Sequence, residues 1–141
     1  MLVACQQPHG PALNTSNVDV FLPLPGSGAA VAYFQLNNLS DETISIERIS
    51  SPQFGKVEMH ETTINDGIAR MRPVDRLKIA ARATTVFEAG GKHIMLTQPQ
   101  IELTVDAAVR LEIHYYYDNE SHNNESGLVI IDARMQTRST P

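Results

Sequence analysis

The sequence is poor in cysteine and in basic residues, and it has no long apolar run. Its single cysteine, Cys5, cannot form an internal disulfide, a thiolate zinc cluster or an iron–sulfur site. Lysine and arginine total 11 against 16 acidic residues, so the formal net charge is -5. Proteins that bind duplex nucleic acid need a surplus of positive charge, and this chain is therefore a poor candidate for that class. No stretch approaches the roughly 18 apolar residues that a membrane span requires.

The N-terminus lacks an intact signal peptide, because it has no basic segment and no apolar stretch of about 7–15 residues. However, Leu2-Val3-Ala4-Cys5 resembles a bacterial lipobox, in which a small residue precedes a cysteine that is lipidated after cleavage. We therefore expect a lipid anchor at Cys5, outside the cytoplasm. An incidental free cysteine is the alternative interpretation.

The composition is typical of one small folded domain. The 141 residues are 42% apolar and 19% charged, which excludes disorder and provides enough length for one buried core. Four prolines among residues 6–28 indicate an N-terminal tail over residues 1–28 that includes an edge strand near residues 18–22. We expect the folded domain over residues 29–136 and a C-terminal tail over residues 137–141.

From residue 29 onward, short runs rich in Val, Ile, Tyr, Phe and Thr alternate with turn residues. No 11-residue stretch shows helical periodicity. The fold class expected is all-β, an antiparallel sandwich or barrel of about eight strands. The predicted strands cover residues 30–37, 43–50, 56–63, 68–74, 84–88, 92–97, 109–117 and 127–136.

Common catalytic and nucleotide-binding motifs are missing. Gly26-Ser27-Gly28 lacks the spacing of a nucleophile elbow and follows prolines rather than a strand. No third glycine follows at the spacing of a dinucleotide-binding loop, and no Walker loop is present. A blue-copper centre is disfavoured as well, because its cysteine would be Cys5, which lies outside the expected folded domain.

Two histidines and two methionines form pairs on the predicted strands. His60 and Met71 lie on the two arms of a predicted hairpin whose turn falls within residues 65–67. They face each other directly if residues 65–66 form the turn, and they lie diagonally if residues 66–67 form it. Both registers keep the two side chains on one face. His93 and Met95 are two residues apart on one strand, so they also share a face.

The chemistry of this set favours Cu(I). Zinc sites use Cys, His and carboxylates, and hard cations prefer oxygen ligands. Two thioethers with two imidazoles and no anionic ligand suit a soft monovalent ion, with Ag(I) as a chemical mimic. The absence of thiolate also lets the metal leave, as a carrier requires. The alternative is that the methionines fill the core and the histidines are ordinary polar residues.

The spacing of the four residues is similar to the signature of the PCuAC-type periplasmic copper chaperones. Ten residues separate His60 from Met71, twenty-one separate Met71 from His93, and one separates His93 from Met95. The resemblance runs from about Ala30 to Met135. The flanking segments that carry it are VEMHE at residues 57–61, DGIARMRPV at residues 66–74 and GGKHIML at residues 90–96.

This resemblance implies a cupredoxin-like Greek-key β-barrel in which the four residues bind one Cu(I) near the surface. It implies a metallochaperone, not an enzyme, in the periplasm or anchored to a membrane of the bacterial cell envelope. Copper would pass, with a Sco-type thiol protein involved, toward the CuA site of cytochrome c oxidase. A copper buffer for metal tolerance and a β-sandwich binding module without metal are the alternatives.

The sequence departs from the family pattern in two ways. It has no Met- and His-rich C-terminal extension, which places a second copper site there in doubt, and it contains no export signal. Three further expectations concern residues near the motif. Met59 alternates with His60 and should enter the core, Glu61 and Lys92 should flank the opening of the site, and His114 should be structural or exposed.

Overall fold

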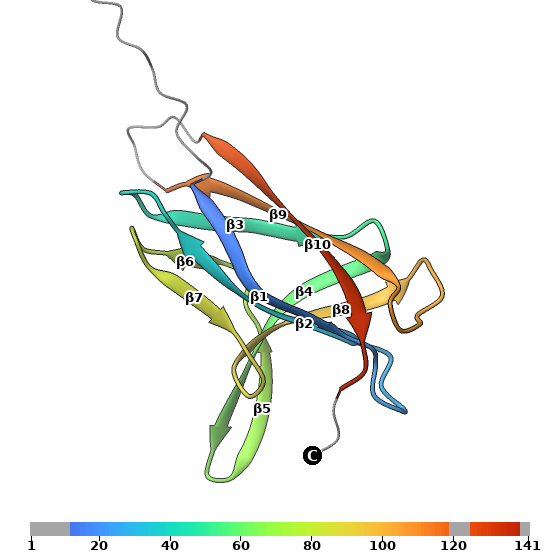
Figure 1. The fold of residues 1–141 in the computed structure, drawn as a ribbon. Helices are drawn as coiled ribbons and strands as arrows, with labels where there is room; N and C mark the ends of the chain where they lie inside the picture. Colours follow the sequence, from blue (N-terminus) through green and yellow to red (C-terminus); the bar gives the residue numbers. More distant parts are fainter. Residues whose placement is uncertain (1–11, 119–124, 139–141) are drawn as a thin grey trace, which may run out of the picture.

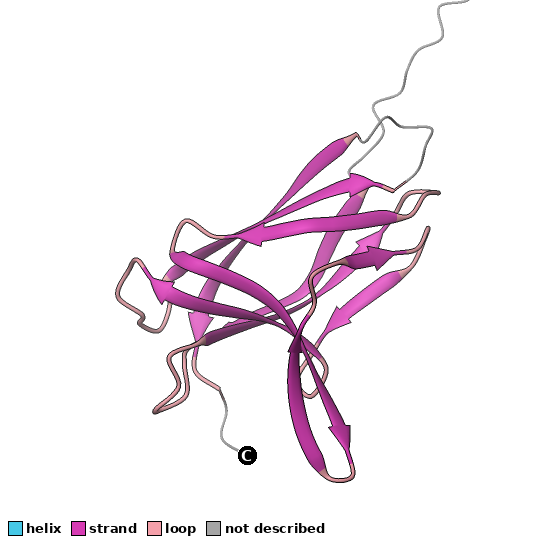
Figure 2. Ribbon diagram, turned by 180° about the vertical axis from the view of Figure 1, so that it is seen from behind, coloured by secondary structure: helices cyan, strands magenta, loops and turns pink. Residues whose placement is uncertain are grey.

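The computed structural model describes residues 12–118 and 125–138, and within these ranges it contains ten strands (Figure 1). Figure 2 shows the described chain as strands and loops without a helix. The strands are β1 (Leu13–Phe21), β2 (Ala30–Asn38), β3 (Ile44–Ser50), β4 (Phe54–Asn65), β5 (Ile68–Pro73), β6 (Leu77–Ile79), β7 (Thr84–Phe87), β8 (Lys92–Pro99), β9 (Ala108–Tyr117) and β10 (Ser126–Gln136).

The strands form two sheets that enclose one core. The first sheet has the order β5-β4-β8-β2-β1, with β7 also paired to β2, and the second has the order β10-β9-β3-β6. A short parallel pairing of β1 with β10 joins them, whereas the other pairs are antiparallel. Apolar side chains from both sheets are fully buried between them, including Val20, Phe34, Ile46, Leu96, Leu111 and Met135.

The expected all-β, cupredoxin-like fold is confirmed, with ten described strands instead of about eight. The prediction of an edge strand within an N-terminal tail is wrong. β1 begins at Leu13 and lies between β2 and β10, with Leu13 and Val20 in the core. A bulge between Ser16 and Asp19 interrupts its register, and Asn17 there adopts a positive φ of 52°. The alternation of apolar residues that identifies a strand is therefore broken.

The short strand β6 was also not predicted from the sequence. It has three residues, of which Leu77 and Ile79 are buried against the core and Lys78 is exposed. A run this short gives too few alternations to stand out from a loop.

The β4–β5 hairpin extends well beyond the rest of its sheet (Figure 1). β4 pairs with β8 only as far as Glu61, and from Thr62 to Asn65 it pairs with β5 alone. Asp66 and Gly67 form the turn, with φ values of 51° and 76°. This matches the two-residue turns with positive φ that suit the twist of a hairpin. Of the two registers left open by the sequence, the structure therefore has the one with residues 66–67 in the turn.

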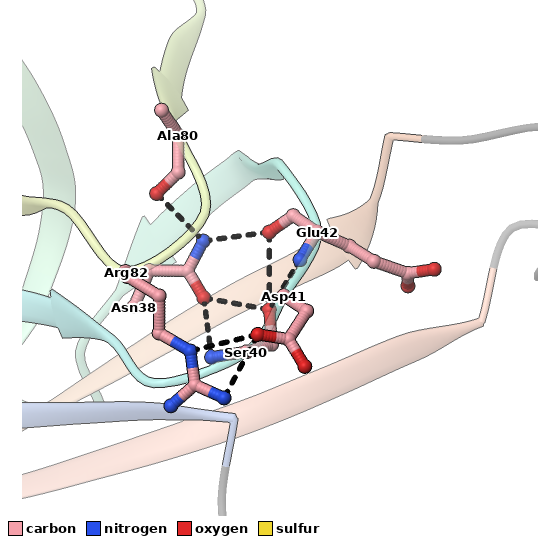
Figure 3. Close-up of polar contacts among 6 residues, drawn as sticks. All are labelled: Asn38, Ser40, Asp41, Glu42, Ala80 and Arg82. Carbon is pink, nitrogen blue, oxygen red and sulfur yellow. Dashed lines mark hydrogen bonds and ion pairs between the residues drawn. The ribbon is translucent and has the colours of Figure 1, made fainter.

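A buried amide fixes the corner that follows β2 (Figure 3). The Asn38 side chain is 1% exposed. Its Nδ2 lies within hydrogen-bond distance of the carbonyl oxygens of Glu42, Ile79 and Ala80, at 2.8, 3.0 and 3.1 Å. Its Oδ1 accepts hydrogen bonds from the backbone and the hydroxyl of Ser40. One side chain thus ties the β2–β3 corner to the end of β6.

The lipobox-like segment at residues 2–5 lies outside the described residues, as do Asn119, Glu120 and residues 139–141. Among the residues that are described, no helix has the length and apolar character needed to cross a membrane.

Candidate metal site

Adjacent strands β4 and β8 bring the two predicted histidines together. His60 lies directly opposite His93 in the antiparallel ladder, and their ring centroids are 5.8 Å apart. Met59 and Ile94, which alternate with them, point into the core. Because side chains alternate between the faces of a strand, the histidines lie on the outer face of the sheet. The expectation that Met59 enters the core is confirmed.

The two predicted methionines lie on the same outer face. Met95 follows His93 by two residues on β8. Met71 lies on β5 opposite Thr62, which is two residues beyond His60 on β4. All four side chains therefore share one face, with Met71 diagonal to His60. Met71 is 52% exposed, whereas His93 is only 7% exposed, so the set spans from the protein surface to a buried position.

Three of the four side chains line one shallow hollow of about 250 Å³, formed by Met71, His93 and Met95 together with part of the β1–β2 loop. Leu24 and Ser27 of that loop contribute to its wall. His60 is not part of this wall, and it joins the group through its ring contact with His93.

The nitrogens of the two rings have different surroundings. The Nδ1 of His93 lies 3.1 Å from the carbonyl oxygen of Gly91. A carbonyl only accepts hydrogen bonds, so this Nδ1 carries the proton and Nε2 keeps its lone pair. The Nδ1 of His60 is buried without a hydrogen-bond partner among the described residues. A buried, unpaired nitrogen of this kind is costly in a folded protein, and a metal ion would satisfy it. The residues present thus fit a metal ligand set.

The same face offers no conventional cluster for a hard metal ion. Within the described ranges, no group of three or more His, Cys, Asp or Glu side chains is placed to hold a metal. Besides the two imidazoles, this face presents the thioethers of Met71 and Met95 and the carboxylate of Glu58. The combination of imidazole and thioether ligands is one that Cu(I) accepts.

Two charged residues near the site were not identified from the sequence. Arg138 belongs to the predicted C-terminal tail, yet it lines the same hollow, with its guanidinium 6.0 Å from the Phe21 ring centroid. No sequence signal distinguishes it from other arginines. Glu58 lies two residues before His60, and its Oε2 is 3.7 Å from the Nε2 of His60. Its i, i+2 spacing to His60 on a strand was an available signal for a shared face.

Glu61 and Lys92 do not flank the site, contrary to the sequence-based expectation. They lie opposite each other in the β4–β8 ladder and form an ion pair with a Nζ–Oε1 distance of 3.3 Å. Each directly adjoins one of the histidines in sequence, so alternation places the pair on the opposite face of the sheet.

The family-model comparison covers most of the chain. The model described as "Putative lipoprotein LpqE-like" matches residues 10–117. A curated relative, Uncharacterized protein RP573 of Rickettsia prowazekii (strain Madrid E), is 30% identical over 90 residues. That alignment covers 63% of this chain and 49% of the relative, so the chain spans about half the length of that protein.

Solved structures of PCuAC domains have the same fold. The copper-bound PCuAC domain from PmoF2 superposes with a TM-score of 0.67 at 19% identity, over 91% of this chain and 95% of that domain. The solution structure of CuI-DR1885 from Deinococcus radiodurans gives a TM-score of 0.63 at 22% identity, over 94% of this chain and 82% of that one. The resemblance to PCuAC proteins is therefore confirmed for the fold. The chain belongs to the LpqE-like family and has the fold of PCuAC domains.

Proposed function

We propose that this chain is a Cu(I)-binding metallochaperone domain of the bacterial cell envelope. The observation that carries the proposal is the shared outer face of His60, Met71, His93 and Met95, built from three adjacent strands. The similar structures, the copper-bound PCuAC domain from PmoF2 and CuI-DR1885, support the same metal.

The ligand set suits a carrier rather than a catalyst. Two neutral imidazoles and two neutral thioethers leave the site with the single positive charge of Cu(I) and favour the reduced ion. The proposed role is therefore to bind and release the ion.

Release is favoured by the position of Met71. This residue lies on the β4–β5 hairpin, which projects from the molecule (Figure 1). Met71 is half-exposed, whereas His93 is buried. An incoming ligand from a partner can replace the exposed thioether first, while the histidines still hold the ion. A thiolate-rich acceptor would bind Cu(I) more strongly than thioethers do and thus give the transfer its direction.

The partners and location follow from the family resemblance and are part of the proposal. We infer that a Sco-type thiol protein and the CuA subunit of cytochrome c oxidase are on the route of the copper. The lipoprotein description of the family and the lipobox-like Leu2–Cys5 segment support an envelope location with a lipid anchor at Cys5. Replacement of Cys5 by Ser should then release the full-length protein from the membrane fraction.

Leucine substitution separates copper binding from a purely structural role of the methionines. Leucine keeps the apolar volume of methionine and removes its sulfur. We expect Met71→Leu and Met95→Leu to abolish tight Cu(I) binding without loss of the fold, as measured by a competition titration and by thermal unfolding. Met59→Leu is the matched control, because Met59 directly precedes His60 on β4 but points into the core.

Equal Cu(I) affinity in all three variants and the parent chain would contradict the proposal and favour a β-sandwich binding module. A copper buffer would show the same binding results as a chaperone. Transfer of Cu(I) to a CuA-type acceptor distinguishes these two roles, and it is measured by the absorption of the acceptor after an added oxidant removes one electron from the loaded binuclear centre.

A further inference from the structure

Within residues 12–118 and 125–138, Glu58 is the carboxylate that lies within ion-pair distance of a predicted ligand. It lies on the outer face of β4, directly opposite Met95 in the β4–β8 ladder. Its Oε2 is 3.7 Å from the Nε2 of His60, and its Oε1 is 3.2 Å from the Nζ of Lys56. The carboxylate therefore lies between an exposed cation and the imidazole of His60.

The Glu58 carboxylate gives the two ring nitrogens of His60 different surroundings. A neutral imidazole carries one N–H and one lone pair, and a carboxylate is only an acceptor. The negative charge of Glu58 thus favours the tautomer with the proton on Nε2. The lone pair then lies on Nδ1, the nitrogen that is buried without a hydrogen-bond partner in the described part of the chain.

We propose that Glu58 is a positioning residue of the metal site, whose negative charge 3.7 Å from Nε2 of His60 favours the proton on that nitrogen and leaves Nδ1 as the copper ligand. This inference rests on the proposed function. His93 uses the opposite arrangement, because its Nδ1–H donates to the carbonyl of Gly91 and its lone pair lies on Nε2. One histidine thus binds through Nδ1 and the other through Nε2.

The carboxylate contributes to binding in two ways. A metal at Nδ1 withdraws electron density from the ring and makes Nε2–H a stronger donor, so the 3.7 Å contact strengthens in the loaded protein. The negative charge also attracts the cation. Mutation of a carboxylate that contacts a metal-bound histidine typically lowers metal affinity by about 10–100-fold.

The test compares Glu58→Gln with Glu61→Gln. Glu61 is the matched control, because it also forms an ion pair with a lysine but lies on the opposite face. We expect Glu58→Gln to lower Cu(I) affinity at least about 10-fold and Glu61→Gln to leave it unchanged. Thermal unfolding of both variants should match that of the parent chain, since both side chains are partly exposed.

Nitrogen NMR of the imidazole rings reports a signature that a structural role would not produce. We expect His60 in the metal-free protein to be protonated on Nε2, and Cu(I) to shift Nδ1 of His60 and Nε2 of His93. Protonation of His60 on Nδ1, a Cu(I)-induced shift of its Nε2, or equal affinity of the two variants would overturn the inference. Failure of the parent chain to bind Cu(I) contradicts the proposed function instead, and the metal-free spectrum still tests the contact with Glu58.

Discussion

At the scale of single residues, the structure depends on a few buried polar groups that are fully paired. Asn38 is the clearest, because its buried amide nitrogen lies within hydrogen-bond distance of three carbonyl oxygens and its amide oxygen accepts from the Ser40 hydroxyl (Figure 3). Removing such a group leaves its partners buried and unpaired, which costs more than the hydrogen bonds themselves contribute.

We therefore expect Asn38→Ala to lower the free energy of unfolding by about 2–3 kcal/mol, as measured by denaturant titration. Arg82→Ala is the comparison, because it removes an exposed ion pair with Asp41 at the same corner and should cost less than about 1 kcal/mol. Equal losses in the two variants would contradict the importance of the buried amide.

Single residues also differ in whether their part in the candidate site could be predicted from the sequence. His60, Met71, His93 and Met95 could be grouped from spacing alone, because strand alternation places them on one face in either hairpin register. The role of each ring nitrogen could not be predicted, since it depends on Gly91 and Glu58 in three dimensions. Arg138 could not be predicted either, because the contact of its segment with the hollow is purely tertiary.

At the scale of elements, the β4–β5 hairpin determines where Met71 lies. Beyond β8 the two arms pair only with each other, so the register depends on the turn formed by Asp66 and Gly67. The φ of 76° at Gly67 is strained for any residue with a side chain, although no atom lies within 4 Å of where a Cβ would be. A side chain at position 67 would therefore affect the turn through backbone strain and not through steric contacts.

Gly67→Ala is expected to destabilise the hairpin by about 1 kcal/mol. Faster hydrogen exchange should be confined to the amides of residues 62–71, and Cu(I) affinity should fall up to about fivefold, because binding must restore the position of Met71. Gly28→Ala in the β1–β2 loop is the control, since Gly28 has equal space and no positive φ. Identical exchange in both variants would contradict this account.

The strands with a clear local sequence pattern were predicted most accurately from the sequence. β9 alternates cleanly, β2 and β8 carry short apolar runs, and all three strands were expected within about two residues of their ends. β1 was misjudged, because the bulge at Asn17 breaks its period and the flanking prolines suggested a tail. β1 is held in the sheet by pairing with β2 on one side and β10 on the other. These residues are far apart in the sequence, so their pairing leaves no local sequence pattern.

At the scale of the whole molecule, two sheets are joined around one core, and ion pairs at the surface link strands of the second sheet. Lys78 on β6 contacts Asp118 just after β9 at 2.6 Å, and Arg110 on β9 holds Asp132 on β10 with two hydrogen bonds. The hydrogen bond from Lys78 lowers the pKa of Asp118 below its ordinary value of 3.8, and Arg110 lowers the pKa of Asp132 likewise.

A lowered pKa means that each carboxylate stabilises the fold above its unfolded-state pKa and loses this effect as the pH falls through its folded-state pKa. We expect Asp118→Asn to reduce stability at pH 7, and this difference from the parent chain to shrink progressively as the pH falls below about 4. Denaturant titrations across this range measure it, with Asp132→Asn as a second case. A difference that does not change with pH would contradict the assignment.

The central claim concerns the outer face of β4, β5 and β8, and one titration tests it most directly. The parent chain and His60→Ala are each titrated with Cu(I) against a chromophoric chelator under reducing conditions. The account predicts one tightly bound equivalent in the parent chain and loss of that binding in His60→Ala, with unfolding still cooperative. No binding above background by the parent chain would contradict it.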